Sequence, residues 1–409
     1  MEATRALPRL IILGAGFSKP AGLPLSTELL DLVLTELHAF YGRDTHLHRS
    51  LPAYLDFVRA TSGTTPEPID IEAFAAYLDY RHVFGVLGSD TWSQEGNRDQ
   101  FLLRWGIGRV LHLATPREDV IPDLYLEFAR RLRPRDVVVS FNYDLLLERS
   151  LEHVGQPYRR FPHRLSSVSA TGGIVDCERD EQEVTIVKPH GSLDWVSKAP
   201  YERKLAYMER SSLPGIDGRA FAEEQDPLFG SNACSPTHQV VEGPRLHDDS
   251  LIQIYTLEDL DTYYANQQIA YSHPPLVLAP SDAKQLYGAT LRDLWTGIAL
   301  GGFGWGGISV IGYSLPIADP YAQQILYEVV RGYQTGLEDP GWRIGPMHSI
   351  GLVDKRSSSS EREDLEARFR FLPSEYTRLH LDGFDLDEAM DVIFPDTPIA
   401  MPVQQPSTD

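Results

Sequence analysis

The chain has 409 residues, 42% of them hydrophobic, which is enough for one large α/β domain with insertions or for two domains. Its 58 acidic and 37 basic residues give a formal net charge of −21, which argues against binding to nucleic acid or to an anionic membrane. The two cysteines, Cys177 and Cys234, are too few for a four-cysteine zinc site. No signal-peptide pattern and no apolar run of membrane-spanning length occurs, so we expect a cytoplasmic protein.

In chain order, short apolar runs rich in β-branched residues predict the strands. They stand at residues 10–13, 136–141, 184–187, 275–279, 308–313 and 349–355. Helical or irregular segments separate these runs, and strands that alternate with helices are typical of a parallel sheet. The pattern therefore predicts an α/β fold with a Rossmann-like, mostly parallel sheet and helices on both faces.

Three segments depart from that alternation. Residues 43–133 are patterned as helices without strong strands, residues 197–272 are polar and rich in turn-forming residues, and the chain ends in a polar tail. We therefore expect one Rossmann-type unit over residues 1–395, with a helical insertion at about 41–133. The turn-rich segment is expected to form a smaller lobe or lid insertion, and residues 396–409 a disordered tail.

The first strand runs into a glycine-rich turn, LIILGAGFSKPAGLP at residues 10–24. Gly14 and Gly16 allow a tight turn whose backbone N–H groups stay free to bind a pyrophosphate. The dehydrogenase pattern G-x-G-x-x-G is incomplete, because Lys19 replaces its third glycine and no second strand ends in an acidic residue about 20 residues on. The turn indicates dinucleotide binding without hydride transfer, or else an ordinary strand–helix turn. In the first case Gly16→Val should abolish dinucleotide binding while the fold survives.

Polar residues directly follow two further strands. Asn142 and Asp144 come after the strand at 136–141, and His190 comes after the strand at 184–187. The carboxyl ends of parallel strands meet at the edge where α/β proteins bind ligands. Asn142 can place a ribose hydroxyl or a water, and Asp144 can support the site or cap the following helix. His190 can serve as a general base near neutral pH.

The last two strands end in a similar way. Gly312 permits a close backbone approach, the Ser314 hydroxyl can reach a phosphate, and Asp319 can cap the next helix. Asp354 ends the strand at 349–355 and can meet the ribose hydroxyls of an adenosine. Each residue is a weak signal alone, but their shared position after strands predicts one ligand site.

Together these motifs resemble the sirtuin family, which implies a Rossmann-type fold that binds NAD. The motifs stand in the family's order between residue 10 and about residue 355. The matching residues are Gly14-Ala15-Gly16, Ser18 and Gly22-Leu23-Pro24 for G-A-G-x-S-x-x-x-G-[IL]-P, Asn142-Tyr143-Asp144 for N-x-D, His190-Gly191 for H-G, and Gly312-Tyr313-Ser314 for G-[TS]-S.

Two departures separate the chain from the protein-deacylating sirtuins. Leu25-Ser26-Thr27 replaces their Asp-Phe-Arg segment, and the chain lacks the cysteines of their zinc module. It is more similar to the zinc-free, sirtuin-like NADases of bacterial anti-phage defence. That resemblance implies hydrolysis of NAD, as substrate, to nicotinamide and ADP-ribose without zinc or another metal. It also implies control by assembly, as a homo-oligomer or with a partner such as a translocase ATPase.

The resemblance implies a role for each matching residue. Asn142 would position the water or the ribose, His190 would accept a proton, and Asp144 would hold the local geometry. The dinucleotide would be bound by Gly14, Ala15, Gly16, Phe17, Ser18, Gly312, Ser314 and Asp354. Two other functions stay open on the same motifs. One is NAD-dependent protein deacylation or ADP-ribosyl transfer, and the other is a non-catalytic scaffold that binds NAD or ADP-ribose.

Overall fold

The computed structural model describes most of the chain. The described ranges are 7–64, 68–86, 96–160, 167–168, 174–175, 182–210, 217–236, 254–278, 304–316, 319–339 and 345–399. Of the predicted tail, residues 400–409 lie outside the described ranges, as does Cys177.

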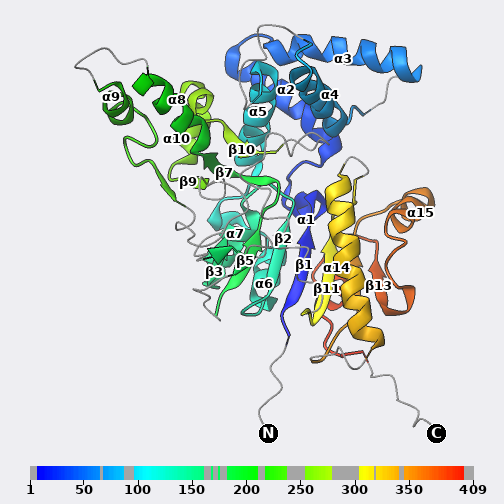
Figure 1. Cartoon of the computed structure of the whole chain (residues 1–409). Coiled ribbons are helices and arrows are strands. Elements are labelled where there is room, and N and C mark those ends of the chain that lie inside the picture. The colour runs from blue at the N-terminus through cyan, green and yellow to red at the C-terminus, as the bar shows by residue number, and fades with distance from the viewer. Residues whose placement is uncertain are drawn as a thin grey trace, which may run out of the picture.

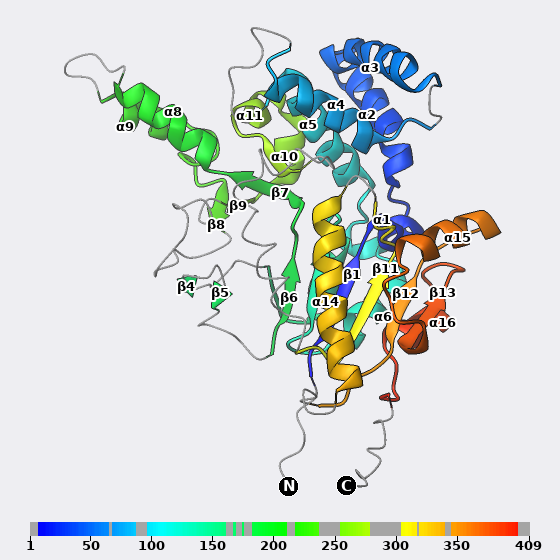
Figure 2. The same cartoon turned by 45° about the vertical axis from the view of Figure 1, so that its right-hand side comes forward.

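Seven strands form a parallel sheet (Figures 1 and 2). Every neighbouring pair in this sheet is parallel. The order across it is β13 (Thr377–His380), β12 (Ile350–Val353), β11 (Gly307–Ile311), β1 (Arg9–Leu13), β2 (Val137–Ser140), β6 (Val184–Val187) and β3 (Tyr158–Arg160). The chain leaves β1 toward β2 and later returns to the other side of β1 at β11, so the topological switch point lies between β1 and β11.

Helices cover both faces of this sheet. Successive residues of β1 point to opposite faces, so Leu10 and Ile12 belong to one buried cluster and Ile11 and Leu13 to another. The first cluster includes α14 (Pro320–Glu338), and the second includes α6 (Asp123–Arg131), α7 (Leu146–Val154) and α16 (Glu388–Ile393). The predicted α/β fold class, a mostly parallel sheet between helical layers, is confirmed.

A second, smaller sheet is antiparallel. Its order is β10 (Pro275–Val277), β7 (Gly191–Ser197), β9 (Ile254–Leu257) and β8 (Cys234–Pro236). The strand predicted at 275–279 is β10, and its expected place in the parallel sheet is wrong. A short apolar run indicates a buried strand but carries no information about its partner. The patterns also miss β3, β7, β9 and β13, which are short or carry polar residues, and the two-stranded ladder of β4 (Ser167–Val168) and β5 (Ile174–Val175).

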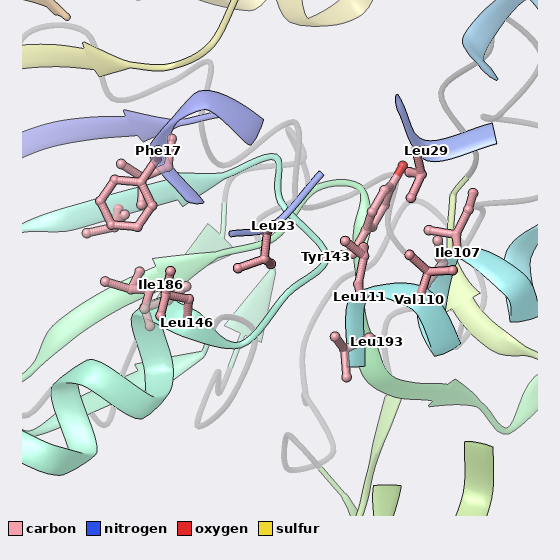
Figure 3. Close-up of a cluster of buried hydrophobic side chains, with 14 of the residues drawn as sticks. Phe17, Leu23, Leu29, Ile107, Val110, Leu111, Tyr143, Leu146, Ile186 and Leu193 are labelled. Atoms are coloured by element: carbon pink, nitrogen blue, oxygen red, sulfur yellow. The ribbon is translucent and has the colours of Figure 1, made fainter. Parts of the chain in front are cut away.

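A group of helices lies over the carboxyl ends of the parallel strands (Figure 1). It contains α2 (Ser26–Tyr41), α3 (His46–Ser62), α4 (Ile71–Val83) and α5 (Arg98–Ala114). Figure 3 shows Tyr143, which follows β2, beside Leu29 of α2 and Leu111 of α5, and these residues share one buried cluster. The helical group is thereby packed directly onto the end of the sheet where the predicted site residues lie.

The other described helices are α1 (Ala15–Ser18), α8 (Ala199–Arg210), α9 (Gly218–Glu224), α10 (Leu260–Ala265), α11 (Gln267–Ser272) and α15 (Ser359–Arg368). Of these, α10 packs against α5 through the stacked rings of Tyr264 and His112. Helices α8 and α9 project outward beside the small sheet (Figure 2). Across the described residues, no helix combines the length and the apolar character needed to cross a membrane.

A buried ion pair joins the two sheets. Arg160, the last residue of β3, lies with Nη1 2.7 Å from an Asp194 carboxylate oxygen on β7, and its Nη2 donates to Thr256 Oγ1 at 3.1 Å. Burial disfavours the charged carboxylate, but the attraction of Arg160 and then of Lys188 outweighs it, so the pKa of Asp194 lies below its ordinary value. The pair therefore holds the edge of the parallel sheet to the small sheet.

Asp194→Asn should lower the free energy of unfolding at pH 7 by about 3–5 kcal/mol, because it leaves the buried Arg160 charge uncompensated. The lowered pKa means that the stabilisation from Asp194 is complete above its unfolded pKa of about 4 and is lost as the pH falls through the folded value. Urea denaturation at pH 7 and at falling pH measures both effects, and the gap between wild type and variant should narrow in acid. Asp56→Asn, which breaks the exposed pair with Arg59, is the control and should cost far less. Equal losses for the two variants would contradict the prediction.

Candidate functional site

A cavity of about 910 Å³ opens at the carboxyl ends of the parallel strands, at the switch point between β1 and β11. Its volume falls in the range of ligand-binding clefts. Apart from Phe17, every residue that the sequence assigns to the site lines this cavity, namely Gly14, Ala15, Gly16, Ser18, Asn142, Asp144, His190, Gly312, Ser314 and Asp354. Stretches that are far apart in the sequence are thus brought together at one place.

Phe17 does not line the cavity. Its ring is 1% exposed and lies 5.0–5.2 Å, between centroids, from the rings of Tyr125, Phe128 and Phe384. Its backbone carbonyl accepts a hydrogen bond from the Tyr125 hydroxyl at 2.9 Å. The sequence assigns Phe17 to the binding of the dinucleotide, but the turn directs its side chain into the core, so that side chain does not reach the cavity.

The glycines of the turn allow the loop after β1 to pack closely against the loop after β11. The Gly14 and Gly16 N–H groups donate to the carbonyls of Ile311 and Gly312 at 3.0 and 2.9 Å, so they are not free for a phosphate as expected. A Cβ atom on Gly16 would lie 2.6 Å from the Gly312 Cα. A valine here would force the loops after β1 and β11 apart, so we now expect Gly16→Val to destabilise the fold as well as to abolish dinucleotide binding.

Asn142 is held in a defined orientation. Its Nδ2 donates to the Gly14 carbonyl at 2.9 Å and to Ser18 Oγ at 3.1 Å. A carbonyl oxygen can only accept, so the nitrogen of the amide must face Gly14. Ser18 in turn donates to Asp144 Oδ2 at 2.9 Å. This chain of hydrogen bonds leaves the Asn142 Oδ1 as an acceptor for a ligand hydroxyl or a water.

Asp144 forms the floor of the site. Its Oδ1 accepts from the Leu146 N–H at 3.0 Å, so it also shapes the start of α7 as the sequence suggested. Beneath it, Lys188 is fully buried and donates to the Asp144 carbonyl at 2.6 Å and to Glu148 at 3.1 Å. Burial raises the pKa of the Asp144 carboxyl, against the attraction of Lys188. With Ser18 and Lys188 it forms a rigid polar support for Asn142.

His190 lies between aromatic rings and a carboxylate. It follows β6, and its ring centroid is 5.0 Å from that of Phe141 and 6.5 Å from that of Tyr143. Its Nε2 lies 2.9 Å from Asp319 Oδ2, and both side chains are buried. Asp319 also caps α14, as predicted, by accepting from the Ala322 N–H at 3.2 Å.

Tyr143, Tyr313 and Glu72 are among the cavity residues that sequence reasoning missed. Tyr143 and Tyr313 stand inside the matched motifs, and Tyr313 stacks on Phe141 with 4.3 Å between centroids. Burial raises the pKa of both tyrosines well above the ordinary value, so they stay neutral across the working pH range. Glu72 comes from the first turn of α4 and acts electrostatically on both phenols. The two tyrosines could have been found from the sequence, because they stand inside the matched motifs. Glu72 could not, because its segment shows only the apolar pattern of a helix.

Asp354 stands at the opposite end of the cavity. Its Oδ2 accepts from Arg356 Nη2 at 3.0 Å, and its Oδ1 accepts from the Lys355 N–H at 2.7 Å. These contacts hold the carboxylate in place at the end of β12, where the sequence expects the ribose of an adenosine. Each carboxylate oxygen retains capacity to accept a further hydroxyl proton.

Several helix N-termini meet at the cavity. Lining residues include Ala15 and Ser26, which begin α1 and α2, Ile71, which begins α4, and Asp319, which precedes α14. The aligned dipole at the N-terminus of a longer helix, here α2, α4 or α14, attracts anions, although Asp70 and Asp319 already cap α4 and α14. The site is therefore suited to a ligand with a central anionic group, such as a pyrophosphate.

One group of metal-type ligands occurs among the described residues, and it lies away from the cavity. His38, Asp44 and His48 place one ligand atom each within 4.8 Å of the others. Both His48 nitrogens already have partners, because Nδ1 accepts from the Thr45 N–H and Nε2 lies 2.9 Å from the Leu34 carbonyl. None of these three residues lines the cavity.

No family model matches the chain, and no curated protein matches it. Among solved structures, one described as "The Structural basis of Sirtuin Substrate Affinity" is similar to it over 95% of this chain and 93% of that chain. The two are 11% identical and superpose with a TM-score of 0.28. At that score the likeness supports no argument about function, so the functional case depends on the motifs and on the cavity.

Proposed function

We propose that this protein is an NAD glycohydrolase, which cleaves NAD to nicotinamide and ADP-ribose. The observation that carries the proposal is the meeting of the glycine-rich turn, Asn142 and His190 in one cavity at the switch point of a parallel sheet. The motif resemblance indicates NAD as the substrate, and the helix N-termini at the cavity favour binding of its pyrophosphate. The two ends of the cavity differ in chemistry, with Asp354 and Arg356 at one and Asn142 and His190 at the other.

In the proposed binding mode, the adenosine ribose meets Asp354 and the nicotinamide ribose meets Asn142 and His190. The bond between ribose C1′ and the nicotinamide nitrogen breaks, and its electron pair returns to the ring, so nicotinamide leaves as a neutral molecule. The ribose passes through an oxocarbenium-like state, as in other glycoside cleavage. A water oxygen then bonds to C1′ while its proton passes to His190, and Asn142 Oδ1 orients that water. The product is ADP-ribose.

The proposal predicts nicotinamide release from NAD in the absence of any peptide. The purified full chain is incubated with NAD and the products are separated by chromatography. Release that requires an acylated peptide would instead support the deacylase, and binding of NAD without release would support the scaffold. Either of these two results contradicts the glycohydrolase.

On the strength of the same resemblance, we propose a role in anti-phage defence by NAD depletion, with activity controlled by assembly. The partner would be a second copy or a translocase ATPase, and the net charge of −21 would favour a basic docking face on such a partner. The nicotinamide assay is therefore run over a range of protein concentrations, with molar mass followed by light scattering. Full activity of a monomer at nanomolar concentration would contradict control by assembly.

A further inference from the structure

His190 and Asp319 form a buried polar contact in the lining of the cavity. His190 follows β6, whereas Asp319 precedes α14, the helix after β11, and β1 and β2 lie between β6 and β11 in the sheet. The Nε2 and Oδ2 atoms lie 2.9 Å apart, and the two side chains are 7% and 2% exposed. A carboxylate this close to an imidazole, away from bulk water, stabilises the positively charged imidazolium by electrostatic attraction.

The other described groups around His190 do not provide a second negative charge in contact with its ring. Phe141 is apolar, and the phenols of Tyr143 and Tyr313 are neutral because burial raises their pKa. Glu72 faces the two phenols from α4, and the Asp144–Lys188–Glu148 cluster lies below the floor of the site. Among the described contacts, the carboxylate that lies within ion-pair distance of His190 is that of Asp319.

We propose that Asp319 is a positioning residue for His190. Its carboxylate raises the affinity of His190 for the proton that the attacking water gives up. It also stabilises the imidazolium formed in that step, as the aspartate does in a nucleophile–histidine–aspartate arrangement. This role builds on the proposed glycohydrolase, but the pairing itself exists independently of the reaction. Sequence reasoning assigned Asp319 only to the helix cap, and its second carboxylate oxygen carries the new role.

The test uses the variant Asp319→Asn and measures two quantities. The amide side chain of this variant retains an oxygen for the cap of α14 but loses the charge that faces His190. The first readout is the pH profile of kcat/KM for NAD, whose acid limb should move down by about one pH unit or more in the variant. The second is the titration midpoint of the His190 Cε1–H signal in the NMR spectrum of histidine-labelled full chain, assigned with His190→Gln. This midpoint should fall by a similar amount, and kcat should fall more than KM changes.

Asp226→Asn is a matched control. Asp226 is buried, places Oδ2 2.9 Å from His273 Nε2, and uses Oδ1 to accept backbone N–H groups, but it lies outside the cavity. Its replacement should leave the His190 midpoint and the pH profile unchanged. If Asp319→Asn fails to fold, Asp319→Ser provides a second variant with a capping hydroxyl and no carboxylate.

The outcomes separate this proposal from the proposed function. An unchanged His190 midpoint in Asp319→Asn overturns the pairing, whether or not the enzyme cleaves NAD. A lowered midpoint with an unchanged pH profile overturns the role of Asp319 in the reaction. If wild type cleaves no NAD, the glycohydrolase fails, and the NMR titration still decides whether Asp319 controls the protonation of His190.

Discussion

His190→Ala should reduce the rate of nicotinamide release by about 10²-fold or more, the loss expected when a general base is removed. Asn142→Ala should have an effect of similar size, because Asn142 Oδ1 is the acceptor that the hydrogen bonds to Gly14 and Ser18 present to the ligand. Binding of ADP-ribose should weaken much less in both variants, since its pyrophosphate and adenosine contacts lie elsewhere in the cavity. Steady-state assays and calorimetry measure the two effects separately.

His38→Ala is the control for the general loss of a histidine. His38 is exposed on α2 and does not line the cavity, so this variant should retain wild-type turnover. Near-wild-type hydrolysis by His190→Ala, under conditions where wild type is active, would remove His190 from the mechanism. A parallel loss of ADP-ribose affinity would instead assign His190 to binding.

The second large effect is expected at Gly312. Its φ is +60°, and a Cβ atom there would lie 2.2 Å from the Phe17 nitrogen and 2.3 Å from the Gly16 carbonyl carbon. Gly312→Ala should therefore lower the free energy of unfolding by about 3 kcal/mol or more, since backbone strain and a clash with backbone add together. Dinucleotide binding should be lost as the loops after β1 and β11 separate.

Gly155→Ala isolates the strain from the clash. Gly155 has a φ of +69°, close to that of Gly312, but nothing lies within 4 Å of its Cβ position. This control should cost only about 1–2 kcal/mol, the penalty of a left-handed conformation. Chemical denaturation of both variants gives the comparison, and equal losses would show that close packing at Gly312 is unimportant.

The sequence by itself was sufficient to predict most strands of the parallel sheet and the polar residues that follow them. Apolar, β-branched runs predicted β1, β2, β6, β11 and β12 within one or two residues at either end. Polar residues directly after those strands identified Asn142, His190 and Asp354 as residues of one cavity, because parallel strands bring their carboxyl ends to one edge. The same reasoning placed Asp319 at the start of a helix, since an aspartate that precedes a helix commonly caps it.

Contacts between distant parts of the chain were decided only by the tertiary structure. The apolar run at 275–279 gave no sign that it would pair with β7, because a strand pattern does not specify a partner. The sequence assigned Gly16 to the binding of a pyrophosphate, but the atoms that a Cβ on Gly16 would meet belong to Gly312, which lies in the last third of the chain. The carboxylate of Asp319 reaches the cavity through the packing of α14 on the sheet, and that of Glu72 through the packing of α4 against α2 and α5. Residue type and spacing report the chemistry that each strand end can supply, whereas packing determines which of these groups face one another.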